Sequence, residues 1–154
     1  DAIKGFAAAY MGKMIFDYIY TQSVSEWSSA IFGAFLCGAA CMLGHVFPVF
    51  FQFKGGKGVA TSVGIFAVCC PIAIIVGLCV FAFLLFTSKY VSLSSVSAAV
   101  VVVVLSIIFY DKDAAILPQI ILSLVMGAIV IGKHKDNIKR LMAGTETKVK
   151  FGGK

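Results

Sequence analysis

The fold of this chain is decided by residues 61–86, TSVGIFAVCCPIAIIVGLCVFAFLLF, a stretch that carries no charged side chain. It is longer than the roughly 20 apolar residues that cross a bilayer as a helix. Four more long apolar runs surround it, at residues 5–20, 29–47, 93–110 and 114–132. Lipid cannot hydrogen-bond the backbone, so runs of this length satisfy their amides as helices. The sequence therefore predicts an all-α, polytopic membrane helix bundle with about five membrane segments.

Composition and charge agree with a membrane protein. Of 154 residues, 60% are hydrophobic and only 13% charged, against about 25% charged in soluble domains. The net charge is +6, and seven of the basic residues follow Gly132. Lysine and arginine beside a membrane helix mark the cytoplasmic side and attract anionic lipid. We therefore expect residues 1–154 to form one transmembrane domain with membrane lipids, and no nucleic acid, as partners.

The cysteines and the motif inventory exclude several kinds of chemistry. All five cysteines lie inside apolar runs without metal-ligand spacing, which is typical of free, buried thiols. The chain has neither a Gly-x-Ser-x-Gly nucleophile elbow nor a His-Glu-x-x-His metal motif. We expect no metal and no other cofactor.

The most informative loop reads Lys54-Gly55-Gly56-Lys57-Gly58. Three glycines in four positions let the backbone turn its N–H groups around an anion, and the two lysines add positive charge. A helix that begins shortly afterwards would place its positive dipole end at the loop. The pattern favours phosphate binding, and a flexible basic loop at the membrane surface is the alternative.

A second constellation lies in the basic tail. His134, Asn137 and Arg140 recur every three residues, so they share one side of a short helix that ends near Gly144. Arginine binds phosphate through two parallel hydrogen bonds, and histidine and asparagine can orient a hydroxyl or a phosphate oxygen. Glu146 follows just past the helix end. A solvated basic helix at the membrane surface explains the same pattern.

Three lone polar residues are secondary candidates. His45 lies just before Pro48, where it could hydrogen-bond the neighbouring loop or take part in catalysis. Ser92 and Ser95 open a helix, where they could line a site or cap the helix end.

Several of these segments together resemble one family. Residues 44–50, GHVFPVF, and 54–61, KGGKGVAT, look like the central signature of the bacterial acyl-phosphate glycerol-3-phosphate acyltransferases. Residues 89–95, KYVSLSS, and 134–146, HKDNIKRLMAGTE, resemble the family's later blocks in the same order.

The resemblance implies an enzyme of the bacterial cytoplasmic membrane that needs no cofactor. It would move a fatty acyl group from acyl phosphate to the 1-hydroxyl of glycerol 3-phosphate, giving lysophosphatidate and inorganic phosphate. The catalytic residues would be Lys57, His134 and Asn137. The phosphates would be held by Lys54, Lys57, Arg140 and the backbone of Gly55, Gly56 and Gly58.

Two features depart from a simple assignment. The family's Gly-Ser-Gly-Asn motif has no match, and residues 1–5 resemble the segment that follows it. We therefore expect a further segment upstream and an isolated chain that is inactive.

In addition, three crossings between the glycine-rich loop and the tail would put them on opposite faces. Either one segment is short or re-entrant, or residues 61–86 are split near Pro71.

The alternative function is a small transporter or channel subunit for anionic metabolites.

Overall fold

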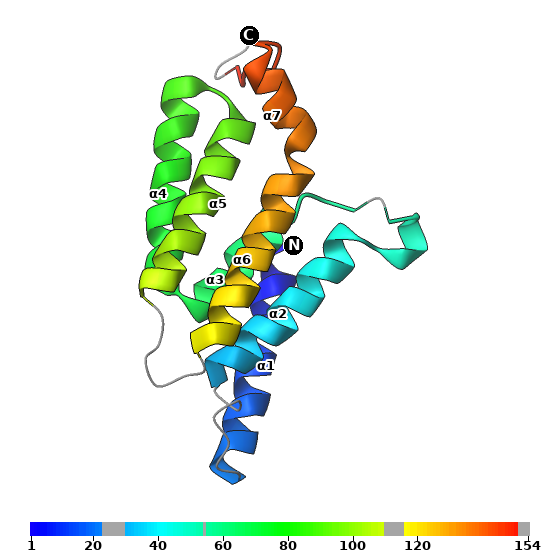
Figure 1. The fold of residues 1–154 in the computed structure, drawn as a ribbon, viewed down its shortest axis with the longest axis vertical. Helices are drawn as coiled ribbons and strands as arrows, with labels where there is room; N and C mark the ends of the chain where they lie inside the picture. The colour runs from blue at the N-terminus through cyan, green and yellow to red at the C-terminus, as the bar shows by residue number, and fades with distance from the viewer. Residues whose placement is uncertain (23–29, 54, 110–115, 151–154) are drawn as a thin grey trace.

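The computed structural model describes residues 1–22, 30–53, 55–109 and 116–150. Within these ranges the chain forms α-helices and one short 3₁₀ helix, η1, and no strand (Figure 1). The predicted all-α class is confirmed. The helices, in chain order, are α1 (Ala2–Gln22), α2 (Ala30–Val46), η1 (Val49–Phe51), α3 (Val59–Cys69), α4 (Pro71–Ser88), α5 (Val91–Ile108), α6 (Ile116–Lys133) and α7 (Lys135–Met142).

Fewer helices qualify as membrane spans than the five that we predicted. Among the described residues, three are long and apolar enough to cross a membrane: the stretch Ala30–Phe51, which joins α2 to η1, and the helices α4 and α5. The pair α6 and α7 adds a fourth if it is counted as one span, and it bends by 56°. The prediction treated every apolar run as one crossing, but α1 does not qualify and α6 qualifies only together with α7.

The apolar run at residues 61–86 is not one helix, because it breaks at Cys70 and Pro71. Helix α3 ends at Cys69, and Cys70 has φ −150° and ψ 79°, outside the helical region. Proline disfavours a helical conformation in the residue before it, yet it fits the first turn of a new helix, and Pro71 begins α4. With 11 residues, α3 is about 16 Å long, roughly half the hydrocarbon thickness of a bilayer.

This break resolves the topology question. Because α3 is short and α4 starts a new helix, the glycine-rich loop and the tail can lie at the same end of the bundle. Figure 1 shows α4 and α5 as an antiparallel pair, and the segment after η1 runs back toward the junction of α6 and α7. Both explanations left open by the sequence apply, because the run is split at Pro71 and its first helix, α3, is short.

Small residues bring α1, α2 and α3 into close contact. A Cβ on Gly12 of α1 would lie 2.3 Å from the carbonyl oxygen of Gly33 on α2. A Cβ on Gly64 of α3 would lie 2.0 Å from the carbonyl oxygen of Ala2. Backbones this close are typical of membrane bundles. Lipid provides no hydrophobic driving force between helices, so the helices associate through close van der Waals packing, which small residues allow.

Candidate functional site

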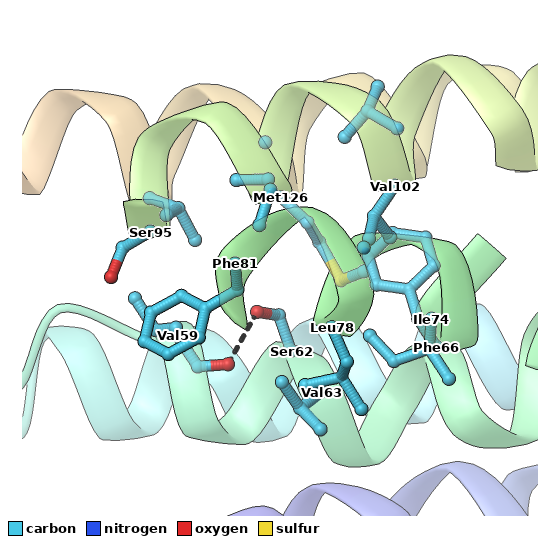
Figure 2. Close-up of a pocket in the computed structure, with 16 residues that line it drawn as sticks. Val59, Ser62, Val63, Phe66, Ile74, Leu78, Phe81, Ser95, Val102 and Met126 are labelled. Atoms are coloured by element: carbon cyan, nitrogen blue, oxygen red, sulfur yellow. Dashed lines mark hydrogen bonds between the residues drawn. The ribbon is translucent and has the colours of Figure 1, made fainter. Parts of the chain in front are cut away.

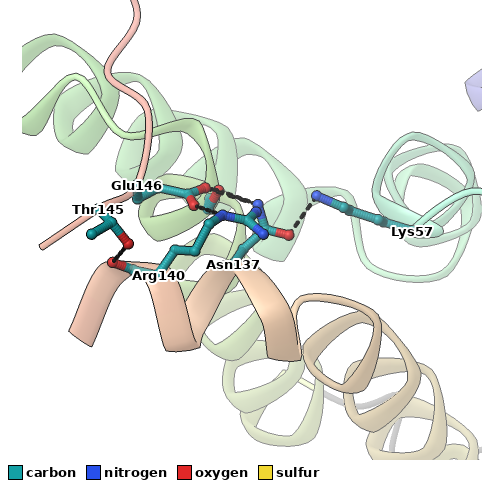
Figure 3. A network of polar contacts seen from close by, with 6 residues as sticks. Lys57, Asn137, Arg140, Thr145 and Glu146 are labelled. Atoms are coloured by element: carbon teal, nitrogen blue, oxygen red, sulfur yellow. Dashed lines mark hydrogen bonds and ion pairs between the residues drawn. The ribbon is translucent and has the colours of Figure 1, made fainter. Parts of the chain in front are cut away.

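Five polar residues from four segments meet near the junction of α6 and α7, and Figure 3 labels four of them, Lys57, Asn137, Arg140 and Glu146. The C-terminal part of the site comes from α7 and the residues after it, and the rest comes from the glycine-rich loop and the start of α5. We call these five residues the polar cluster: Lys57, Ser92, Asn137, Arg140 and Glu146.

Asn137 joins the segments of the polar cluster. Its Oδ1 accepts a hydrogen bond from Lys57 Nζ at 2.7 Å, across 80 residues of sequence. Its Nδ2 donates to Ser92 Oγ at 2.9 Å and to Glu146 Oε1 at 2.8 Å. The residue is only 9% exposed, and these bonds use both amide hydrogens and the amide oxygen. Its orientation is therefore fixed, and this side of α7 is not the solvated surface that the alternative interpretation required.

Glu146 receives three donors. The hydroxyl of Ser92 and the amide of Asn137 donate to Oε1, and Arg140 Nε donates to Oε2 at 2.6 Å. The Ser92 and Asn137 hydrogen bonds, followed by the Arg140 guanidinium, lower the pKa of Glu146 to about 2. Hydrogen bonds to the charged form of a carboxyl group stabilise it, so Glu146 is an anion at neutral pH.

Arg140 keeps part of its donor set available. It contacts Glu146 through Nε, and its side chain is 47% exposed. A guanidinium group has five N–H donors, so its terminal nitrogens can still bind an oxyanion beside Lys57. The polar cluster thus presents two cations and one internal carboxylate, a net charge of about +1 before any ligand binds.

The glycine-rich loop lies tightly against the end of α2. A Cβ atom on Gly55 would lie 2.1 Å from the His45 carbonyl oxygen, and a Cβ atom on Gly56 would lie 2.3 Å from His45 Nε2. Gly58 has φ +80° and precedes α3, which begins at Val59. Among the described residues, no backbone N–H from Gly55 to Gly58 donates to another backbone group. These amides and the start of α3 therefore form an available anion-binding surface. Lys54 lies outside the described residues.

His134 lies outside the polar cluster's hydrogen bonds. It is 3% exposed and directly precedes α7. A carbonyl oxygen only accepts, so Nδ1–H donates to the carbonyl of Val130 at 2.8 Å. This bond fixes the ring where α6 bends into α7. Of the predicted trio, Asn137 and Arg140 meet at Glu146, and His134 takes a buried place behind them.

An apolar cavity of about 180 Å³ lies between α3, α4, α5 and α6 (Figure 2). It reaches the region of the polar cluster along α5, where Ser95 lines the cavity and Ser92, one turn earlier, bonds Glu146. The two candidate serines therefore face different environments. The cavity is lined by Val59, Ser62, Val63, Phe66, Ile74, Gly77, Leu78, Phe81, Ser95, Ala98, Ala99, Val102, Val103, Met126, Gly127 and Val130.

Sequence reasoning missed Lys133, which joins α6 to α2. Its Nζ donates to the carbonyl of Val46 at 3.1 Å and lies 4.4 Å from the centroid of the Phe47 ring. The sequence feature that could have pointed to Lys133 is its place in the last turn of an apolar helix, where a cation can reach unpaired carbonyl groups. The charge pattern alone places Lys133 only in the basic tail.

The chain as a whole is similar to known proteins. The sequence profile of the family described as glycerol-3-phosphate acyltransferase matches residues 1–144. "Glycerol-3-phosphate acyltransferase 2" of Bacillus anthracis is 43% identical over 121 residues, which are 79% of this chain and 61% of the relative. "Glycerol-3-phosphate acyltransferase" of Fusobacterium nucleatum is 36% identical over 151 residues, 98% of this chain and 70% of the relative.

Two crystal structures of PlsY, an integral membrane glycerol 3-phosphate acyltransferase, are similar to this chain. The glycerol 3-phosphate form matches with a TM-score of 0.71 and 32% identity, over 79% of this chain and 60% of PlsY. The lysophosphatidic acid form matches with a TM-score of 0.74 and 28% identity, over 95% of this chain and 69% of PlsY. The chain thus spans roughly two thirds of the length of the proteins that it matches.

Proposed function

This chain belongs to the glycerol-3-phosphate acyltransferase family, and on that premise we propose that the protein transfers a fatty acyl group from acyl phosphate to the 1-hydroxyl of glycerol 3-phosphate. The products are lysophosphatidate and inorganic phosphate. The proposal places the protein in the bacterial cytoplasmic membrane, since the named relatives are bacterial and PlsY is an integral membrane protein.

One observation carries the proposal: a cationic cluster lies one helical turn from an apolar cavity. Ser92 bonds Glu146 in the polar cluster, and Ser95 lines the cavity on the same helix. An acyl phosphate has a phosphate head and a hydrocarbon tail, so it needs these two environments side by side. A small soluble anion would need only the first.

The tail belongs in the cavity, and the phosphate groups belong at the cationic end. The cavity lies among four apolar helices, so a hydrocarbon tail finds an apolar surrounding there. Among the described residues, the donors available to phosphate oxygens are Lys57, Arg140 and the amides of Gly55 to Gly58, which donate to no other backbone group. We assign the phosphate-binding role to them.

The chemical step needs positioning more than a strong base. The 1-hydroxyl oxygen of glycerol 3-phosphate attacks the acyl carbonyl carbon, the bond from that carbon to the phosphate oxygen breaks, and the hydroxyl proton passes to the departing phosphate. Lys57 and the loop amides stabilise the charge that develops on the leaving group. Glu146 is an anion already occupied by three donors, so the phosphate is the better proton acceptor.

Asn137 and His134 have supporting roles in this account. Asn137 Oδ1 holds the Lys57 ammonium group at 2.7 Å, which keeps that cation in the polar cluster. His134 is fixed by its bond to Val130, whose side chain lines the cavity. Holding both substrates in one geometry supplies much of the rate enhancement for an activated donor.

The test uses the full-length protein in liposomes with glycerol 3-phosphate and labelled palmitoyl phosphate. We expect lysophosphatidate and inorganic phosphate to form in a one-to-one ratio. Movement of glycerol 3-phosphate across the bilayer without product would instead support the transporter alternative and overturn the proposal.

A further inference from the structure

The side chain of His45 lies between α1 and the glycine-rich loop. Lys4 Nζ lies 2.8 Å from His45 Nδ1. The Asp1 carboxylate lies 3.0 Å from Lys4 Nζ and 3.6 Å from the same ring nitrogen. The His45 side chain is only 16% exposed. The ring is therefore held from one side by charged groups at the start of α1.

The Lys4 contact determines where the imidazole hydrogen lies. A lysine ammonium group has donors and no acceptor, so it can bond Nδ1 only if that nitrogen offers its lone pair. The hydrogen of the neutral ring then lies on Nε2. His134 is the opposite case, because its Nδ1–H donates to the Val130 carbonyl.

The Nε2 edge of His45 faces the glycine-rich loop. A Cβ on Gly56 would lie 2.3 Å from Nε2 and 2.8 Å from Cε1, so any side chain at this position would displace the ring. A Cβ on Gly55 would lie 2.1 Å from the His45 carbonyl oxygen and 2.7 Å from the Val46 carbonyl oxygen. Among the described residues, Nε2 has no hydrogen-bond partner, although it lies against the loop whose amides are also free.

We propose that the Nε2–H of His45 is a further donor to the phosphate group held by the glycine-rich loop, and that Lys4 acts as the positioning residue that keeps the ring in this tautomer. This rests on the proposed function, because the ligand is one of the two phosphate substrates. It also explains the glycine at position 56, because a Cβ there would lie 2.3 Å from Nε2 and displace the ring.

The kinetic test compares His45→Gln with His45→Asn in the full-length protein. Glutamine can place an amide N–H near the position of Nε2, whereas asparagine reaches only as far as Nδ1. We expect His45→Asn to raise the KM of a phosphate substrate roughly tenfold, the usual effect of losing one hydrogen bond to a charged group, while His45→Gln stays within about threefold of the wild type. If His45 had only a structural role, the two variants would lose the same amount of kcat or of folded yield, and their KM would not change. This result would overturn the proposal.

A second measurement does not depend on activity. The ring-nitrogen NMR signals of ¹⁵N-histidine-labelled protein report which nitrogen carries the hydrogen. We expect His45 to give the signals of the Nε2–H tautomer and His134 those of the Nδ1–H tautomer. The Lys4→Met substitution should move only His45, toward a mixture of the two tautomers. Inorganic phosphate should shift the His45 Nε2 signal in the wild type. An Nδ1–H tautomer at His45, or no response to phosphate, contradicts the inference. Absence of turnover with the predicted tautomer and phosphate response would overturn the proposed reaction instead.

Discussion

At the scale of single residues, Asn137 has the most constrained environment in the site. Its amide bonds the loop through Lys57, the start of α5 through Ser92 and the tail through Glu146. No helix pattern predicts such a junction, because the partners lie 80, 45 and 9 residues away. The sequence spacing placed Asn137 and Arg140 on one side of a helix correctly, but it could not identify Glu146 as the anion that orients both.

Lys57 supplies the first residue-scale prediction. Replacing it with alanine removes the cation held by Asn137 Oδ1 at 2.7 Å, and loss of one donor to a developing oxyanion lowers turnover about 10²- to 10³-fold. We therefore expect kcat/KM for lysophosphatidate formation to fall by at least about a hundredfold. Lys135→Ala is the matched control, because Lys135 is exposed on α7. Equal rates in the two variants contradict the assignment.

Glu146 makes the stability of the fold sensitive to acid. Its pKa lies near 2 in the folded protein, lowered from 4.5 by its hydrogen bonds to Ser92, Asn137 and Arg140. The folded-state value is the lower one, so this stabilisation is complete above about pH 4.5 and is lost as the pH falls toward 2. We expect the difference in Tm between wild type and Glu146→Gln to be constant near neutral pH and to shrink below pH 4.5. A difference that does not change down to pH 2 would exclude this role.

At the scale of helices, the break before Pro71 decides which segments can meet. Hydropathy predicted that residues 61–86 lie in the membrane, and the proline marked the break, but composition could not distinguish a kink from two separate helices. The difference depends on Cys70, whose φ of −150° and ψ of 79° end α3 before α4 begins. The position of the short α3 depends on its contacts with α1, which involve residues far away in the sequence.

The contact between α3 and α1 can be tested at Gly64. A Cβ at Gly64 would lie 2.0 Å from the Ala2 carbonyl oxygen, and a backbone atom cannot move aside cheaply. We expect Gly64→Ala to lower the free energy of unfolding by about 1 to 3 kcal/mol, even though alanine is the better helix former. Gly132→Ala is the control, since a Cβ at that position would have nothing within 4 Å, and it should be neutral or slightly stabilising. Denaturation in detergent measures both, and similar values would contradict the packing described here.

At the scale of the whole molecule, the bundle places a cationic cluster next to a cavity that lies among its apolar helices. The sequence predicted the two candidate phosphate-binding segments separately and predicted apolar helices around them. It did not predict the cavity, because the cavity exists only where α3, α4, α5 and α6 fail to fill the space between them. Ser92 and Ser95 show this limit, since both open α5 and yet face different environments.

The cavity predicts a dependence on acyl-chain length. Ala99 lines it, whereas Val104 on the same helix is 47% exposed. A phenylalanine at position 99 would add six carbon atoms to the wall of the cavity and displace several methylenes of the acyl chain. We expect Ala99→Phe to raise the KM of palmitoyl phosphate about tenfold and to spare a short-chain acyl phosphate, with Val104→Phe unchanged. An equal loss for both chain lengths would indicate misfolding instead of a filled cavity.

The most direct test of a single site made from the polar cluster and the cavity is photolabelling of the full-length protein in lipid bilayers. The probe is a palmitoyl phosphate analogue with a diazirine near the middle of its chain. The label should map by mass spectrometry to cavity residues such as Phe81 and Ala99, and excess palmitoyl phosphate should suppress it. Label confined to lipid-facing side chains such as Phe83 and Leu124, with no effect of the competitor, would contradict the account.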